Sequence, residues 1–236
     1  MAKYRERERT GILARLLFWG IFAAVLFLWS YPPLIPLRAL IVFIHEVFHG
    51  FAAILSGGSM VAIELGDNFT GRAFTEGGSQ ELILVSGYIG NILFGAILLV
   101  IAFLTRLDRL LSIALGAGMI LISVFFISTP ASMIFGIIIG VAFGLVGLIL
   151  PTVVNEFMLK IIGMTSMLYP LIDVKEDLLF RAVPGSDAYI MGETFGIAPL
   201  FWIILWVVIS VVSVYLIFRF IAFKRIPKGN NISIEN

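Results

Sequence analysis

The sequence predicts an all-α polytopic membrane protein of six to seven transmembrane helices, with a small membrane-associated β-hairpin after the second helix. Of its 236 residues, 60% are hydrophobic and only 13% are charged, whereas about a quarter of the positions in a soluble domain are charged. The apolar residues also fall into successive segments near the roughly 20 residues that a helix needs to cross a bilayer. One membrane-embedded domain over residues 16–223 is therefore expected, between a basic N-terminus at 1–15 and a polar tail at 224–236.

Charge and cysteine content exclude several classes of protein. Sixteen Lys and Arg against fifteen Asp and Glu leave a formal charge of +1, so the chain lacks the basic surface that binds nucleic acid through its phosphates. The absence of cysteine excludes disulfides and every zinc site with sulfur ligands. A bound metal therefore depends on histidine and on oxygen ligands.

The first two apolar segments are residues 16–29 and 34–55. The first follows a basic stretch and ends in interfacial aromatic residues and a Pro32-Pro33 pair. These features are typical of a retained signal anchor rather than a cleaved signal peptide. The second segment contains Glu46 and ends at Gly57-Gly58.

A hairpin is predicted between Met60 and Gln80, where the chain turns from continuous apolar sequence to short alternating pieces. The two strands are expected at residues 61–65 and 72–75, separated by Gly66-Asp67-Asn68. A third crossing follows at residues 82–104.

Residues 110–155 carry no charge, and at 1.5 Å per helical residue they can cross a bilayer twice. The break between these two helices is expected at Ser128-Thr129-Pro130, because the residue before a proline disfavours the helical conformation. Residues 152–171 are predicted to form a sixth crossing, and residues 197–223 form the last.

The positive-inside rule predicts a cytoplasmic N-terminus and favours a cytoplasmic C-terminus as well, since both ends are basic. Seven crossings would place the two ends on opposite sides. Six would place them together, if residues 152–171 lay along the membrane surface. The side of the C-terminus is therefore left open.

The second crossing contains the motif His45-Glu46-Val47-Phe48-His49, in which both histidines share one helix face. Such a pair can bind one Zn²⁺, with Glu46 beside it as general base. The alternative is a pair of histidines in the protein core. These are the only two histidines in the chain, and an unpaired acid inside a membrane costs about 2.5–3.5 kcal/mol. Both facts favour the metal site.

A catalytic zinc usually has three protein ligands, so a carboxylate or an amide must complete the pair. Asp173 is the predicted third ligand, because a crossing at residues 152–171 would bring it to a depth near that of the motif. Asp177 and Asp187 are the alternatives. Without that crossing, Asp173 would lie on the wrong side.

Three blocks of sequence resemble the site-2-protease-like intramembrane zinc metallopeptidases, in particular their short branch without extra domains. They are HEVFHGFAAILSGGSMVAIEL, SGYIGNILFGA (Ser86–Ala96) and the later LIDVKEDL with GSDA. The resemblance implies His45, His49 and Asp173 as zinc ligands and Glu46 as general base. It departs from the family pattern where Val174 follows Asp173 in place of glycine.

A second departure concerns Asn91, since better-known members carry Gly-Pro before this asparagine and the present chain has Gly87-Tyr88-Ile89-Gly90. The resemblance implies that Asn91 binds substrate or stabilises an oxyanion. The alternative is an amide that forms hydrogen bonds between helices.

The predicted function is zinc-dependent hydrolysis of a peptide bond within or next to the bilayer, with a membrane-anchored protein as substrate. The Met60–Gln80 hairpin offers an edge to which an extended substrate can add as a strand. Two other functions remain open: a membrane transport protein that handles a metal ion or protons, and a catalytically silent relative that binds membrane proteins.

Overall fold

The computed structural model describes residues 19–66, 71–173 and 185–225. The predicted basic N-terminus, the hairpin turn at Asp67-Asn68, Asp177 and the tail beyond residue 225 lie outside the described residues.

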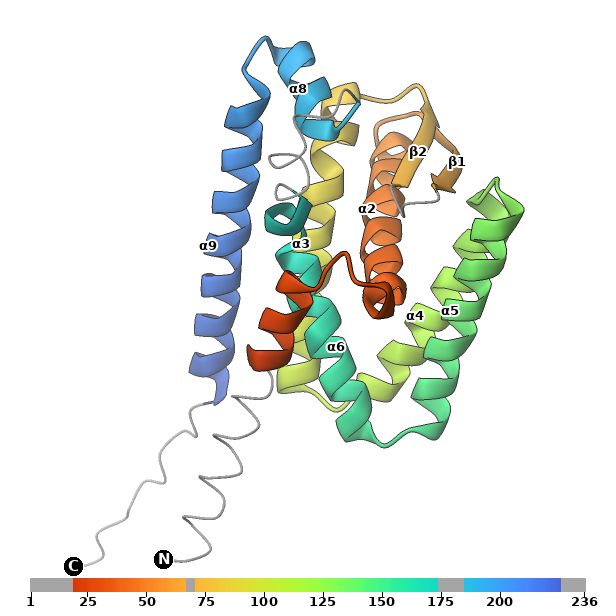
Figure 1. The fold of residues 1–236 in the computed structure, drawn as a ribbon, viewed down its shortest axis with the longest axis vertical. Helices are drawn as coiled ribbons and strands as arrows, with labels where there is room; N and C mark the ends of the chain where they lie inside the picture. The colour runs from red at the N-terminus through yellow and green to blue at the C-terminus, as the bar shows by residue number, and fades with distance from the viewer. Residues whose placement is uncertain (1–18, 67–70, 174–184, 226–236) are drawn as a thin grey trace, which may run out of the picture.

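Within the described residues, five helices are long and apolar enough to cross a membrane. A two-stranded antiparallel hairpin follows the first of them (Figure 1). The predicted class, an all-α membrane protein with a small hairpin, is therefore confirmed. The five helices are α2 (Ile35–Leu55), α3 (Gln80–Leu104), α4 (Asp108–Phe126), α5 (Pro130–Ile149) and α9 (Pro199–Arg225). The other elements are η1 (Pro32–Leu34), β1 (Ser59–Leu65), β2 (Gly71–Glu76), α6 (Thr152–Met167) and α8 (Asp187–Phe195).

Two of the predicted crossings are not among these five. The described part of the first, which begins at residue 19, is helical over residues 19–27. Helix α6 has 16 residues, which at 1.5 Å per residue is about 24 Å, less than the roughly 30 Å of bilayer hydrocarbon. A further helical turn at residues 169–173 follows it.

The two ends of the described chain lie at the same end of the molecule (Figure 1). The Trp19 ring lies 5.8 Å from that of Phe218, near the end of α9. This arrangement agrees with the positive-inside rule, which favours both ends of the chain on one side of the membrane. Which side of the membrane this is stays a prediction.

Prolines mark the helix boundaries as the sequence indicates. Thr129 is extended, and Pro130 begins α5, so the predicted break between α4 and α5 is confirmed. Pro151 likewise precedes α6. The α4 and α5 pair packs closely because Gly116 faces the backbone of Gly140 and Gly144.

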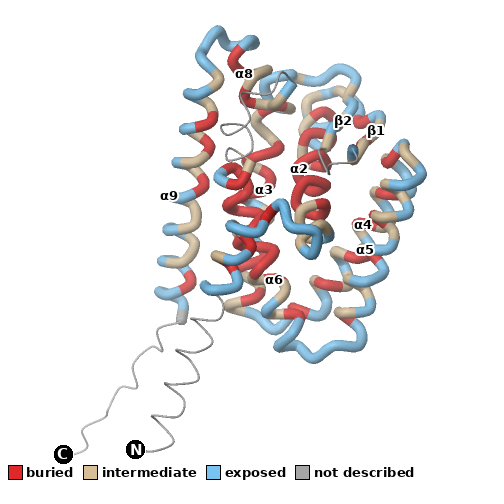
Figure 2. The backbone as a smooth tube through the Cα atoms, viewed as in Figure 1, coloured by how far each residue is buried: buried red, intermediate tan, exposed pale blue. Residues whose placement is uncertain are grey.

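The core of the molecule lies along α2, α3 and α6, which carry most of the buried residues (Figure 2). Helix α9 packs on α3, and the pair α4 and α5 forms the opposite flank in Figure 1. The middle of α2 is therefore enclosed by protein.

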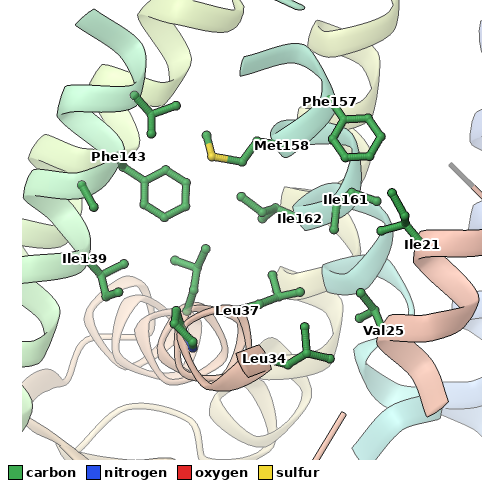
Figure 3. A pocket seen from close by; sticks show the side chains of 14 residues that line it. Ile21, Val25, Leu34, Leu37, Ile139, Phe143, Phe157, Met158, Ile161 and Ile162 are labelled. Carbon is green, nitrogen blue, oxygen red and sulfur yellow. The ribbon is translucent and has the colours of Figure 1, made fainter. Parts of the chain in front are cut away.

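An apolar cavity of about 450 Å³ lies between the start of α2, α5, α6 and the helical residues 19–27 (Figure 3). Leu37, Phe143 and Ile162 point into it, and none of the described residues that line it is ionisable. This cavity suits apolar groups and not hydrolytic chemistry.

The hairpin packs on α2, with Ile63 of β1 opposite Ala73 of β2. The other edge of β1 is partly occupied, because Ile63 also forms a bridge with Ile127. In addition, Ser132 donates a hydrogen bond to the carbonyl of Leu65 at 2.9 Å. These contacts tie β1 to the flank formed by α4 and α5 and leave β2 on the side of α2.

Candidate metal centre

His45 and His49 lie one helical turn apart on α2, inside the protein. Both side chains are buried, and their ring centroids are 4.6 Å apart with the rings nearly perpendicular. The i, i+4 spacing brings both imidazoles to one face of the helix. The two Nε2 atoms can therefore reach one ion.

Asp187 completes a cluster with the two histidines, although it lies 138 residues beyond His49. Its Oδ2 atom is 2.8 Å from His45 Nε2 and 3.1 Å from His49 Nε2. One donor atom from each of the three residues lies within 4.8 Å of the others. Asp187 is brought there as the first residue of α8, where Ser186 caps the helix by accepting a hydrogen bond from the Tyr189 amide.

The electrostatics favour an ionised Asp187. Desolvation by itself raises the pKa of this carboxyl, but the charge of His49 and the hydrogen bonds with both histidines hold it well below its usual range. Desolvation instead raises the pKa of Asp173, and hydrogen bonds from Tyr88 and Tyr169 offset only part of this effect. A carboxylate binds a metal in its ionised form, and the Oδ2 atom of Asp187, unlike the oxygens of Asp173, faces both imidazoles.

The three side chains fit a zinc ion. Two imidazole nitrogens and one carboxylate oxygen are a donor set that catalytic zinc uses. The other ring nitrogen of His49, Nδ1, is 2.6 Å from the carbonyl of Ile83. In the neutral imidazole that binds a metal, this bond places the proton on Nδ1 and leaves the Nε2 lone pair for the ion.

Gly87 of α3 provides space beside both imidazoles. A Cβ atom at this position would lie 2.5 Å from His49 Nε2 and 2.6 Å from His45 Nε2. Only glycine therefore leaves the two Nε2 atoms accessible from α3.

Glu46 lies beside the cluster and under strand β2. It is buried, and the backbone amide of Ala73 lies within hydrogen-bonding reach of its carboxylate. A Cβ atom on Gly71 would overlap the same carboxylate. The first residues of β2 therefore close over Glu46.

Asp173, the third ligand that the sequence predicted, lies in a different environment. Its two carboxylate oxygens accept hydrogen bonds from Tyr88 at 2.5 Å and from Tyr169 at 3.1 Å. Among the described residues, the carboxylate in contact with both imidazoles belongs to Asp187, which the sequence treated as an alternative. The signal for Asp187 was present in Gly185-Ser186-Asp187, where Ser186 is a typical helix N-cap. The metal ligands themselves stay a prediction.

Asn91 is fully buried between three helices. Its side-chain amide donates to the carbonyl of Ile41 on α2 at 3.4 Å, and Ser166 of α6 donates to its backbone carbonyl at 2.9 Å. These bonds match the interhelical role that the sequence left open. A role in substrate binding stays a prediction.

Two histidines of an H-E-x-x-H helix, a carboxylate facing both and a glutamate beside them define a metallopeptidase-type centre within a bundle of membrane helices. Comparison with protein-family models agrees: residues 18–217 match the peptidase M50B-like family, and the chain belongs to this family. The match confirms the resemblance to site-2-protease-like peptidases and spans every site residue above. Comparison with curated proteins and with solved structures gives no match.

Replacing Gly87 with alanine is expected to weaken zinc binding at least tenfold, because the added methyl group occupies the space next to both ligand nitrogens. Elemental analysis of the purified protein and a zinc competition titration measure the effect. Gly118→Ala on α4 is the matched control, since nothing lies within 4 Å of its Cβ position. Undiminished zinc affinity in Gly87→Ala would show that the metal does not bind at this point.

Proposed function

We propose that this protein is a zinc-dependent peptidase that hydrolyses peptide bonds of membrane-anchored proteins within or next to the bilayer. One observation carries the proposal: His45, His49 and Asp187 converge on one point inside a membrane helix bundle, with Glu46 next to them. Membership of the peptidase M50B-like family supports a metallopeptidase.

The residues that would hold the metal are His45 and His49 through Nε2, and Asp187 through its carboxylate. When bound, zinc supplies a Lewis acid that lowers the pKa of water and polarises a carbonyl group. The nitrogen and oxygen donor set favours zinc over the calcium and magnesium ions that oxygen-only sites select.

Glu46 serves as the proton carrier. Its carboxylate lies beside the two histidines but is not one of the three clustered ligands. It accepts the proton of the attacking water on a carboxylate oxygen and returns it to the nitrogen of the leaving amine. The amide of Ala73 and the backbone of Gly71 hold this carboxylate in place.

Strand β2 is the proposed binding edge for the substrate. A peptide bond in a formed helix is shielded by its own hydrogen bonds, so the substrate segment must first become extended. A chain that adds to β2 as a strand runs past Ala73, whose amide already faces Glu46. The contacts of β1 with Ile127 favour β2 as the edge that receives substrate.

The test uses the full chain, purified in detergent and reconstituted in vesicles with a panel of single-span peptides that carry fluorogenic bonds near the membrane. We expect one zinc per chain and cleavage of at least one peptide. Both should be lost after treatment with a zinc chelator and restored by added zinc.

Two outcomes would contradict the proposal. A chain that binds no zinc even after resupply is not a zinc peptidase, and its buried histidines would then indicate transport or helix packing. Stoichiometric zinc without cleavage of any peptide in the panel would indicate a silent relative that binds membrane proteins.

A further inference from the structure

Asp173 lies at the centre of a hydrogen-bonded group that the catalytic mechanism does not use. It accepts one hydrogen bond from Tyr88 of α3 and one from Tyr169, which follows α6. Both tyrosine side chains are buried. The carboxylate therefore connects two segments that are far apart in the sequence.

The two tyrosine rings form the walls against which the His45 imidazole lies. The ring of Tyr88 is 4.8 Å from that of His45, and the ring of Tyr169 is 5.3 Å away, both in edge-on arrangements. The ring of Trp206 on α9 also packs on Tyr88, with 5.6 Å between the ring centroids and a tilt of 31° between the rings.

The two histidines are oriented in different ways. His49 is fixed by the hydrogen bond from its Nδ1 to the carbonyl of Ile83. The Nδ1 atom of His45 is buried and forms no hydrogen bond within the described part of the chain. Apart from the contact of its Nε2 atom with Asp187, the direction of the His45 ring depends on the rings packed against it.

We propose that Asp173 is a positioning residue of the metal centre: it anchors the hydroxyls of Tyr88 and Tyr169 and thereby fixes the two rings that orient His45. The inference rests on the proposed function, because it takes His45 as a metal ligand. Asp173 then acts through the tyrosines and contributes no donor atom to the metal.

This role predicts weaker metal binding without a change of ligands. Loss of a group that orients a metal ligand lowers metal affinity by roughly 10- to 100-fold. An asparagine at position 173 has an NH2 donor in place of one of the two carboxylate oxygens that accept from the tyrosines, and it carries no charge to strengthen either hydrogen bond. Asp173→Asn is therefore expected to weaken zinc binding within that range.

The experiment compares wild type with Asp173→Asn, Tyr88→Phe and Tyr169→Phe. Zinc affinity is measured by competition with a chromophoric chelator, and cobalt-substituted protein gives the visible absorption spectrum of the metal site. All three variants should bind zinc more weakly but keep a wild-type cobalt spectrum. Two matched controls should keep wild-type affinity. Tyr215→Phe removes the hydroxyl of an exposed tyrosine on α9, and Thr165→Val removes a buried hydroxyl on α6 that donates to the carbonyl of Ile161.

A double-mutant cycle separates positioning from general destabilisation. Once Asp173 is asparagine, adding both Tyr→Phe changes should weaken zinc binding by less than the product of the separate effects. Strict multiplication of the effects, or wild-type affinity in all three variants, overturns the positioning role.

The remaining outcomes distinguish this inference from the proposed function. An altered cobalt spectrum in Asp173→Asn, with an unaltered one in Asp187→Asn, would make Asp173 a ligand and overturn the inference alone. A wild-type chain that binds no zinc overturns both.

Discussion

Replacing Asp187 with alanine is expected to remove the bound zinc and abolish any peptidase activity. The carboxylate faces both imidazoles at 2.8 Å and 3.1 Å, and its loss leaves two protein ligands where a catalytic zinc needs three. The loss of affinity should exceed the roughly 10- to 100-fold cost of removing a group that only orients a ligand. Elemental analysis after dialysis measures it as zinc per chain.

Two variants show whether this effect belongs to the carboxylate or to the helix that carries it. Ser186→Ala removes the cap of α8, which costs about 1 kcal/mol, but leaves Asp187 in the chain and should keep the zinc. Asp173→Ala should retain zinc at saturating concentration, with weaker affinity. If Asp173→Ala loses all zinc while Asp187→Ala keeps it, the ligand assignment is wrong.

The membrane fold could be predicted because composition and segment length almost determine it. A membrane-spanning backbone has to satisfy its own hydrogen bonds, which leaves helices as the default for apolar segments. The break before Pro130 and the hairpin over residues 59–76 followed from local backbone preferences. The sixth predicted crossing, residues 152–171, is interrupted at Leu168, and no signal in the sequence marks this break because Leu168 is as apolar as the residues before it.

The motif of the site could be predicted, whereas the carboxylate that faces both histidines was named only as an alternative. His45, Glu46 and His49 belong to one helix, so their spacing in sequence fixes their spacing in space. Asp173 and Asp187 lie far from the motif in the sequence, so no spacing relates them to the histidines, and Ser186 indicates only that a helix begins at Asp187. The prediction of Asp173 depended on membrane depth, and depth does not reveal that Tyr88 and Tyr169 bind this carboxylate.

Replacing Glu46 with glutamine is expected to abolish peptide hydrolysis while zinc binding stays intact. Glutamine has nearly the same shape and can still accept the hydrogen bond from the Ala73 amide. It cannot take up a proton at neutral pH, and general acid–base catalysis is worth about 10²- to 10⁴-fold in rate. Fluorogenic cleavage measured beside zinc content tests both halves of the prediction.

The matched control is Glu81→Gln at the exposed start of α3, which removes a carboxylate from a membrane helix away from the cluster. It should cleave at the wild-type rate. Wild-type cleavage by Glu46→Gln would mean that another group carries the proton, and loss of zinc in this variant would make Glu46 part of the metal site. Intact zinc binding without hydrolysis in Glu46→Gln would separate metal binding from proton transfer. The metal would then be held without Glu46, and Glu46 would be the residue that moves the proton.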